Sequence, residues 1–211
     1  MHTFQDCEKK AEELGLLANK IAKAHGIRVP MDEDSMQYLR RLQEATTQKE
    51  RWQVHEESPE DSPIEQAALL AIEKTCEDDL RRATTQEERW QAFSDSPKGS
   101  AISWVVLQAY LDNATTQEER WDVYTEAPEG SELERASLQS YLDNATQEER
   151  WEVCQDATEG SALEKATLQA IEKACEDDLR RATTQEELWQ VYNDTPDGSA
   201  VEQATIRALC S

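Results

Sequence analysis

The motif Thr-Gln-x-Glu-x-Trp occurs five times in this chain of 211 residues. Its tryptophans are Trp52, Trp90, Trp121, Trp151 and Trp189, so successive copies are separated by 38, 31, 30 and 38 residues. Periods of about 20 to 50 residues are typical of arrays in which each unit is a small supersecondary motif that cannot bury its apolar face alone. The repeat therefore favours units that are stacked on their neighbours in sequence.

Each repeat contains two helix start signals. At the first, a Thr is followed three residues later by a Glu, which is the capping box whose side chains bind free backbone N–H groups. At the second, a Ser has the same role after a short turn. The predicted capping boxes are Thr47/Glu50, Thr85/Glu88, Thr116/Glu119, Thr146/Glu149 and Thr184/Glu187 in the first helices, and Ser62/Glu65, Ser131/Glu134, Ser161/Glu164 and Ser199/Glu202 in the second.

Some repeats carry a longer second helix than others. The segment between Ala71 and Ala83 has seven more residues than the segment between Ala109 and Ala114. Seven residues are nearly two helical turns, so the insertion lengthens a helix without rotating its apolar face. Residues 68–91 and 167–190 differ at only four of 24 positions, including surface positions. This identity indicates a recent duplication, so recurrence of a residue is weak evidence for function.

We predict an all-α protein, an α-solenoid-like array of five helical hairpins with repeats of 30–38 residues. Residues 1–45 are assigned to an N-terminal cap of two helices, an amphipathic segment over Asp6–His25 and a second helix from about Asp34. Residues 46–211 are the acidic helical-repeat region, in one continuous domain with the cap. A closed multi-helix bundle is the alternative, because units of unequal length would form an irregular superhelix.

The charge is concentrated in the repeats. The chain has 45 acidic and 22 basic residues, a net charge of -23, of which the first 45 residues account for only -1. Clustered cations are needed to bind nucleic-acid or membrane phosphates, so neither is expected as a direct partner. A protein partner with a basic surface is favoured instead. Acids that no cap requires form the candidate acidic surface: Glu77, Asp78, Asp79, Glu176, Asp177 and Asp178.

One segment departs from the repeat. Trp104 and Val106 stand where the other repeats have polar or small residues, and with Ile102 they form a candidate partner contact. Packing inside the chain is the alternative for this segment. The five repeated tryptophans are predicted to form the core between hairpins, rather than to stack on bases, sugars or a cationic ligand. The Arg that precedes Trp in four repeats is predicted to pair with acids within the chain, rather than to grip phosphates.

No pattern of residues indicates catalysis. The three histidines, His2, His25 and His55, are scattered, and no Gly-rich phosphate loop or metal-binding His pair is present. The acidic turns lack the ligand spacing of a calcium loop. We therefore predict no enzyme, no catalytic residue, no cofactor and no metal.

The sequence also bears on location and function. Five cysteines without a Cys-x-x-Cys pair indicate core thiols in a reducing compartment. No transmembrane helix or secretory signal is predicted, so we expect a cytoplasmic protein, although export without a cleavable signal would leave no such trace. We expect a non-enzymatic protein–protein interaction or scaffolding module. The alternative is a nucleic-acid mimic that blocks a DNA- or RNA-binding protein, and the oligomeric state is left open.

Overall fold

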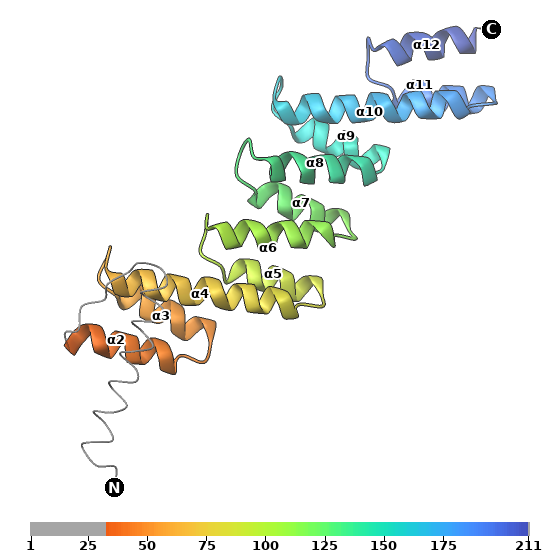
Figure 1. Cartoon of the computed structure of the whole chain (residues 1–211). Coiled ribbons are helices and arrows are strands. Elements are labelled where there is room, and N and C mark those ends of the chain that lie inside the picture. The colour runs from red at the N-terminus through yellow and green to blue at the C-terminus, as the bar shows by residue number, and fades with distance from the viewer. Residues whose placement is uncertain (1–32, 211) are drawn as a thin grey trace. The chain divides into compact units, whose positions relative to one another are not determined.

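A computed structural model describes residues 33–210 of the chain. These residues form eleven helices and no strand (Figure 1), which confirms the all-α prediction. The predicted cap helix over Asp6–His25 lies outside the described residues. The helices are α2 (Glu33–Glu44), α3 (Gln48–Glu57), α4 (Pro63–Arg82), α5 (Gln86–Ser94), α6 (Ala101–Asp112), α7 (Gln117–Glu126), α8 (Glu132–Asn144), α9 (Gln147–Asp156), α10 (Ala162–Arg181), α11 (Gln185–Asp194) and α12 (Ala200–Leu209).

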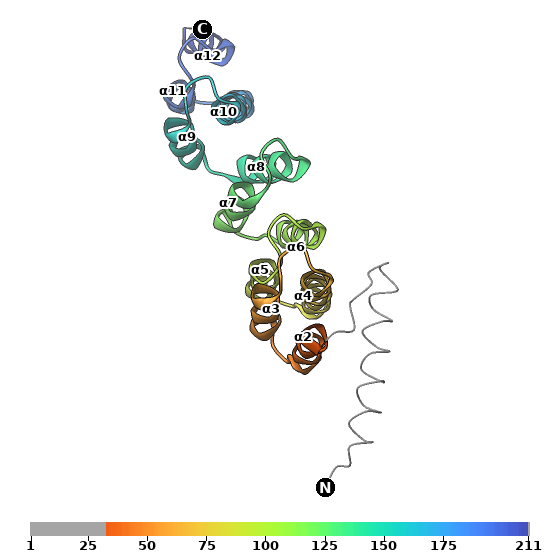
Figure 2. The same ribbon diagram turned by 90° about the vertical axis from the view of Figure 1, so that its left-hand side faces the viewer.

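The chain divides into two compact units between Asn113 and Ala114. Unit 1 contains α2 to α6 and unit 2 contains α7 to α12. The two helices of every predicted hairpin contact each other, from α3 with α4 to α11 with α12. Second helices also contact each other within a unit, as α4 does with α6 and α10 with α8 and α12. Figure 2 shows the result in unit 1, where α3 and α5 lie in one layer and α2, α4 and α6 in another.

The helix starts follow the predicted chemistry with one difference. All five first helices have the complete Thr/Glu capping box. At the second helices the Ser hydroxyl accepts the predicted hydrogen bond from the backbone N–H of the Glu, as Ser161 does from Glu164. The Glu carboxylate, however, accepts from the residue before the Ser and not from the Ser itself. In this way Gly160 N donates to Glu164 Oε2 at 2.5 Å. Asp61, Gly130 and Gly198 donate in the same way to the Glu four residues later. The predicted box is therefore wrong in this detail, because the preceding residue has a positive φ that turns its N–H toward the helix.

The lengths of the second helices confirm the insertion. Helices α4 and α10 have 20 residues each, whereas α6 has 12 and α8 has 13. The extra turns keep the apolar side in phase, since Ile72 and Cys76 in α4 and Ile171 and Cys175 in α10 are all fully or almost fully buried.

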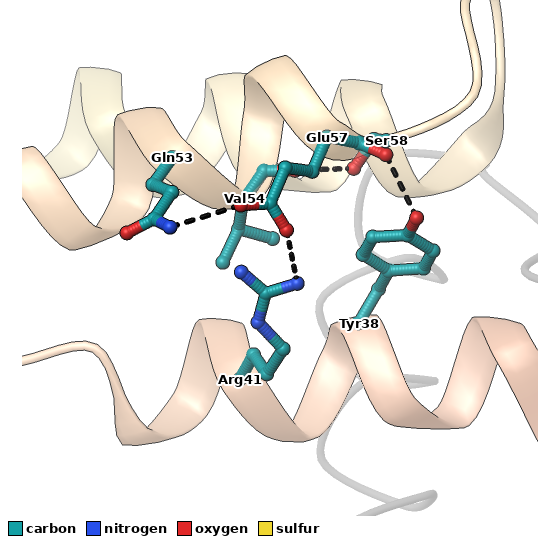
Figure 3. Close-up of polar contacts among 6 residues, drawn as sticks. All are labelled: Tyr38, Arg41, Gln53, Val54, Glu57 and Ser58. Atoms are coloured by element: carbon teal, nitrogen blue, oxygen red, sulfur yellow. Dashed lines mark hydrogen bonds and ion pairs between the residues drawn. The ribbon is translucent and has the colours of Figure 1, made fainter.

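Helix α2 is fixed to the first hairpin by a polar cluster (Figure 3). The Tyr38 hydroxyl donates to the Glu57 carbonyl at 2.7 Å, and Arg41 Nη1 donates to Glu57 Oε2 at 2.5 Å. The hydrogen bond from Arg41 lowers the pKa of the Glu57 carboxyl. Leu39 packs against Ile64 of α4 beside this cluster. The described part of the cap region thus contacts both helices of the first hairpin.

The hydrophobic core lies between successive hairpins. In unit 1, Trp52 of the first hairpin packs against buried residues of α4, α5 and α6. In unit 2, Trp151 packs in the same way against α10, α11 and α12. The buried residues of these two clusters are Ile72, Cys76, Ala92, Ile102 and Val106 in unit 1, and Ile171, Cys175, Val191 and Val201 in unit 2. In these two clusters, one hairpin therefore depends on the next for burial of its apolar side.

Candidate functional site

The candidate acidic surface lies at the C-terminal ends of α4 and α10. Its six carboxylates are within reach of arginines in the last turn of the same helix. Arg81 lies 2.9 Å from Asp78 and 3.4 Å from Glu77, and Arg180 lies 2.7 Å from Asp177 and 3.2 Å from Glu176. Looser pairs at 3.7 and 3.8 Å join Arg82 to Asp79 and Arg181 to Asp178.

These ion pairs reduce the charge that each acidic segment presents. Three acids face two arginines in each segment, so the excess is one negative charge rather than three. The arginines are largely exposed, and exposed pairs of this spacing contribute only about 0.3–0.5 kcal/mol each. A partner could displace them at little cost. The carboxylates are accessible, but they are weaker sources of charge than the sequence suggested.

A shallow polar groove lies beside each acidic segment. In unit 2, a cavity of about 500 Å³ opens between the last turn of α8 and the second half of α10, over a floor that includes Leu142 and Ala170. In unit 1, a cavity of about 270 Å³ lies between the start of α3 and the end of α4. The linings contain equal numbers of acidic and basic side chains, among them Arg150 and Arg51. Neither groove therefore adds to the negative surface.

The candidate partner contact is divided between core and surface. Val106 has no exposed area and Ile102 only 8%, and both belong to the core of unit 1. Packing within the chain therefore accounts for these two residues. Trp104 is half-buried. The adjacent Val105 has 55% of its surface exposed, and sequence reasoning missed it. The uninterrupted apolar run from Trp104 to Leu107 was the available signal, since a helix cannot bury every side of such a run against one neighbour.

Two of the repeated tryptophans, Trp52 and Trp151, are anchored by hydrogen bonds as well as by packing. The indole N–H of Trp52 donates to the Asp95 carbonyl at 3.1 Å, and that of Trp151 donates to the Asp194 carbonyl at 3.2 Å. Both acceptors lie at the end of the first helix of the next hairpin. The amides of Gln48 and Gln147 donate to the same two carbonyls. A core role is confirmed for these two tryptophans, and the Gln of their motifs contributes to the same contact. For Trp189 the prediction is wrong, since 52% of its surface is exposed.

Three of the four repeated arginines bind backbone carbonyl groups rather than carboxylates, and Arg89 donates to the side-chain amide oxygen of Gln86. Arg51 Nη2 donates to the Ala45 carbonyl at 3.2 Å, and Arg120 Nη2 donates to the Ala114 carbonyl at 3.1 Å. Arg150 donates through Nε to the Leu142 carbonyl at 2.9 Å. These oxygens lie at or near the C-terminal end of the preceding second helix, where cations are favoured by the helix dipole. The predicted pairing with acids is therefore wrong, and the row has a structural role.

The shifted pKa values have structural causes. Backbone N–H groups of the capping boxes lower the pKa of Glu88 and Glu187, and lower that of Glu50 to about 2. Burial raises the pKa of the Cys76 thiol to about 12, as expected for a small core residue. Asp122 differs, because burial raises its pKa and repulsion from Glu118 and neighbouring acids adds to the shift.

Residues 33–210 show no group of three or more His, Cys, Asp or Glu side chains placed to hold a metal ion. Within the same range, no helix has the length and apolar character needed to cross a membrane.

Fold and repeat define the class of the protein, an all-helical protein built from repeated hairpins. Comparisons with protein families, curated proteins and solved structures find no match to this chain.

Proposed function

We propose that the chain is a non-enzymatic protein–protein interaction or scaffolding module whose acidic helical-repeat surface binds a basic protein partner. The observation that carries the proposal is the imbalance of charge. Within the described residues, ion pairs shorter than 4 Å involve only eight acidic side chains, whereas the full chain carries a net charge of -23. A field of this size attracts a basic partner over long distance and speeds its encounter.

The most regular source of uncompensated charge is the first helix of each hairpin. Glu118, Glu148 and Glu186 occupy the same place in three successive hairpins of unit 2, directly before the capping Glu. All three are exposed and form no ion pair with the described residues. They also stand in the first turn of a helix, where acidic side chains are commonly found. In unit 2 a basic surface can therefore meet one exposed carboxylate per hairpin, as well as the acids Glu176, Asp177 and Asp178 at the end of α10.

The recurrence of one exposed acid in each hairpin of unit 2 also favours the alternative, a nucleic-acid mimic that occupies the binding site of a DNA- or RNA-binding protein. The two functions share an acidic surface, but they differ in what competes for the partner. A mimic is displaced by a nucleic acid, because both ligands need the same basic site. A scaffold bound elsewhere on its partner is not displaced.

The test is capture on the immobilised full chain from a lysate of the cells that produce it, at about 0.05 M and about 0.5 M salt. We expect a basic protein that is retained at low salt and lost or weakened at high salt. One variant neutralises the six acids of the candidate surface to Asn or Gln, and a second neutralises Glu118, Glu148 and Glu186 to Gln. Neither touches a capping residue, so both should fold.

The proposal predicts that at least one of these variants loses the partner, and that Trp104→Ala weakens capture if the apolar site contributes. Retention of the partner by both charge variants would contradict an acidic binding surface. Recovery of no partner under any condition would contradict an interaction module. Release of the captured protein by added DNA or RNA duplex would favour the mimic over the scaffold.

A further inference from the structure

The groove of unit 2 lies where two neighbouring helices differ in length. Helix α10 has 20 residues and α8 has 13, so α10 continues past the C-terminal end of α8 (Figure 1). The open space between them is the cavity of about 500 Å³. Its lining on α10 reaches from Ala166 to Arg181, a path of about 22 Å along the helix. An extended peptide of about six or seven residues has the same length.

The floor of this groove consists of small apolar residues. Ala166, Ala170 and Ala174 are spaced by four residues, so they share one side of α10. Ala166 and Ala170 pack against the cluster that contains the buried Leu142 of α8. Because the three alanine side chains are single methyl groups, the main chain of a bound peptide can lie close to the helix.

The rim carries polar groups that lack partners among the described residues. The Gln169 amide and the Lys173 ammonium group are exposed, and neither has a hydrogen bond or an ion pair there. Asp143, at the end of α8, accepts a hydrogen bond from Gln139 at 2.9 Å but has no ion pair within the same range. A Gln amide can donate to one peptide group and accept from another, whereas the two charges require opposite charges on a ligand.

Unit 1 lacks this combination, although most of α4 has the same sequence as α10. Leu70 and Thr75 occupy the places of Gln169 and Ala174, and these are two of the four differences between the duplicated segments. Leu70 has no polar side-chain group, and the Thr75 hydroxyl donates to a carbonyl of its own helix at 2.9 Å. The cavity beside α4 has only about 270 Å³. The two copies therefore differ at positions that line the groove of unit 2.

We propose that the groove of unit 2 binds an extended peptide segment of a protein partner, a segment with both an acidic and a basic side chain. Gln169 binds a peptide group of the segment, Lys173 pairs with its acidic side chain and Asp143 with its basic one. A small-molecule site would bury most of its ligand among apolar side chains, which this shallow polar groove does not provide.

This site goes beyond the proposed function, because it selects a pattern of charges rather than a net charge. The acidic surface attracts a basic partner over long distance, whereas the groove is lined by equal numbers of acidic and basic side chains. Replacing Lys173 by Glu makes the chain more acidic, so it should remove peptide binding while capture of a basic partner persists. The two proposals can therefore fail independently.

The test is a nuclear magnetic resonance titration of the isotope-labelled full chain with end-blocked peptides of about seven residues. The panel has an alanine–serine background with one Glu and one Lys at varied order and spacing, and comparison peptides carry Glu alone or Lys alone. We expect a mixed-charge peptide to bind with a Kd below about 1 mM and to shift the side-chain amide signal of Gln169. Lys173→Glu and Gln169→Leu should each weaken that binding about tenfold or more. Gln169→Leu introduces the residue that α4 has at this place, so the helix should accommodate it.

Lys74→Glu is the matched control, because Lys74 is the counterpart of Lys173 in α4 and lines neither groove. It changes the net charge by the same amount and should leave peptide binding unchanged. The absence of any shift with the whole panel would overturn the proposal, as would undiminished binding by both groove variants or an equal loss in the Lys74 variant. Peptides with Lys alone that bind as tightly would also overturn it, and would assign the groove to the basic partner of the proposed function.

Discussion

Replacing Trp151 by Ala tests whether the repeated tryptophan stabilises the contact between hairpins. Its indole packs against buried side chains of α10, α11 and α12, and its N–H binds the Asp194 carbonyl. Trp189 provides an internal comparison, because it has the same place in the next repeat but is 52% exposed. If the tryptophan stabilises the protein by packing, Trp151→Ala and Trp189→Ala must lower the free energy of unfolding by different amounts, although the same side chain is removed.

The expected magnitudes follow from burial. Truncation of a buried Trp to Ala costs about 3–5 kcal/mol, so the half-buried Trp151 should cost about 3 kcal/mol. Trp151→Phe keeps most of the apolar contact and loses the N–H donor, which should cost about 1 kcal/mol. Trp189→Ala should change stability by about 0.5 kcal/mol or less, as exposed substitutions usually do.

The assay is urea unfolding of the full chain, followed by far-ultraviolet circular dichroism. For a slope of about 1–3 kcal/mol per molar urea, a loss of about 3 kcal/mol lowers the midpoint by about 1–3 M. If the two units unfold separately, only the transition of unit 2 should move. Equal costs for Trp151→Ala and Trp189→Ala would refute the packing argument, and so would a cost below about 1 kcal/mol for Trp151→Ala.

Three further predictions concern local chemistry. Backbone N–H groups lower the pKa of Glu50 from its ordinary value of 4.5 to about 2. The stabilising contribution of this carboxylate is therefore complete above pH 4.5 and is lost as the pH falls through about 2. Glu50→Gln should flatten this part of an acid unfolding profile. Gly160 has φ 79°, and nothing lies within 4 Å of an added Cβ, so Gly160→Ala should destabilise the protein through backbone strain alone. We expect a cost of about 1–2 kcal/mol, measured by thermal or urea unfolding. Asp61 has φ 56°, so Asp61→Gly should stabilise the protein. The exposed Cys210 should react with a thiol reagent at mildly alkaline pH, while Cys76, whose pKa burial raises to about 12, should stay unlabelled until unfolding, as measured by mass mapping.

The local part of the fold could be predicted from the sequence because its causes are local. Thr47 and Glu50 are three residues apart, so their reciprocal bonds depend on the first turn of one helix alone. The lengths of α4 and α10 follow from a seven-residue insertion in a periodic apolar pattern. The burial of Trp151 could also be expected, because one large aromatic residue per repeat has few other uses.

The partners of polar side chains could not be predicted, because they depend on how neighbouring helices meet. Arg150 stands among acids in the sequence, but the end of α8 brings the Leu142 carbonyl within 2.9 Å of its Nε. The acids of α10 likewise pair with arginines three or four residues away. This spacing is compatible with pairing on a helix, but net charge alone does not indicate which acids are paired. The exposure of Val105 next to the buried Val106 also follows from the direction in which α6 faces its neighbours.

The acidity of the array limits where it can associate with itself. Hairpin units expose apolar side chains wherever a neighbour is missing, and such faces promote uncontrolled association. A charge of -23 opposes close approach of two chains over most of their surfaces, because exposed acids of each repeat would face acids of the other. Self-association would therefore require a patch where apolar burial exceeds this repulsion. Under the proposed function the same charge attracts a basic protein, so one property both discourages self-association and favours the partner.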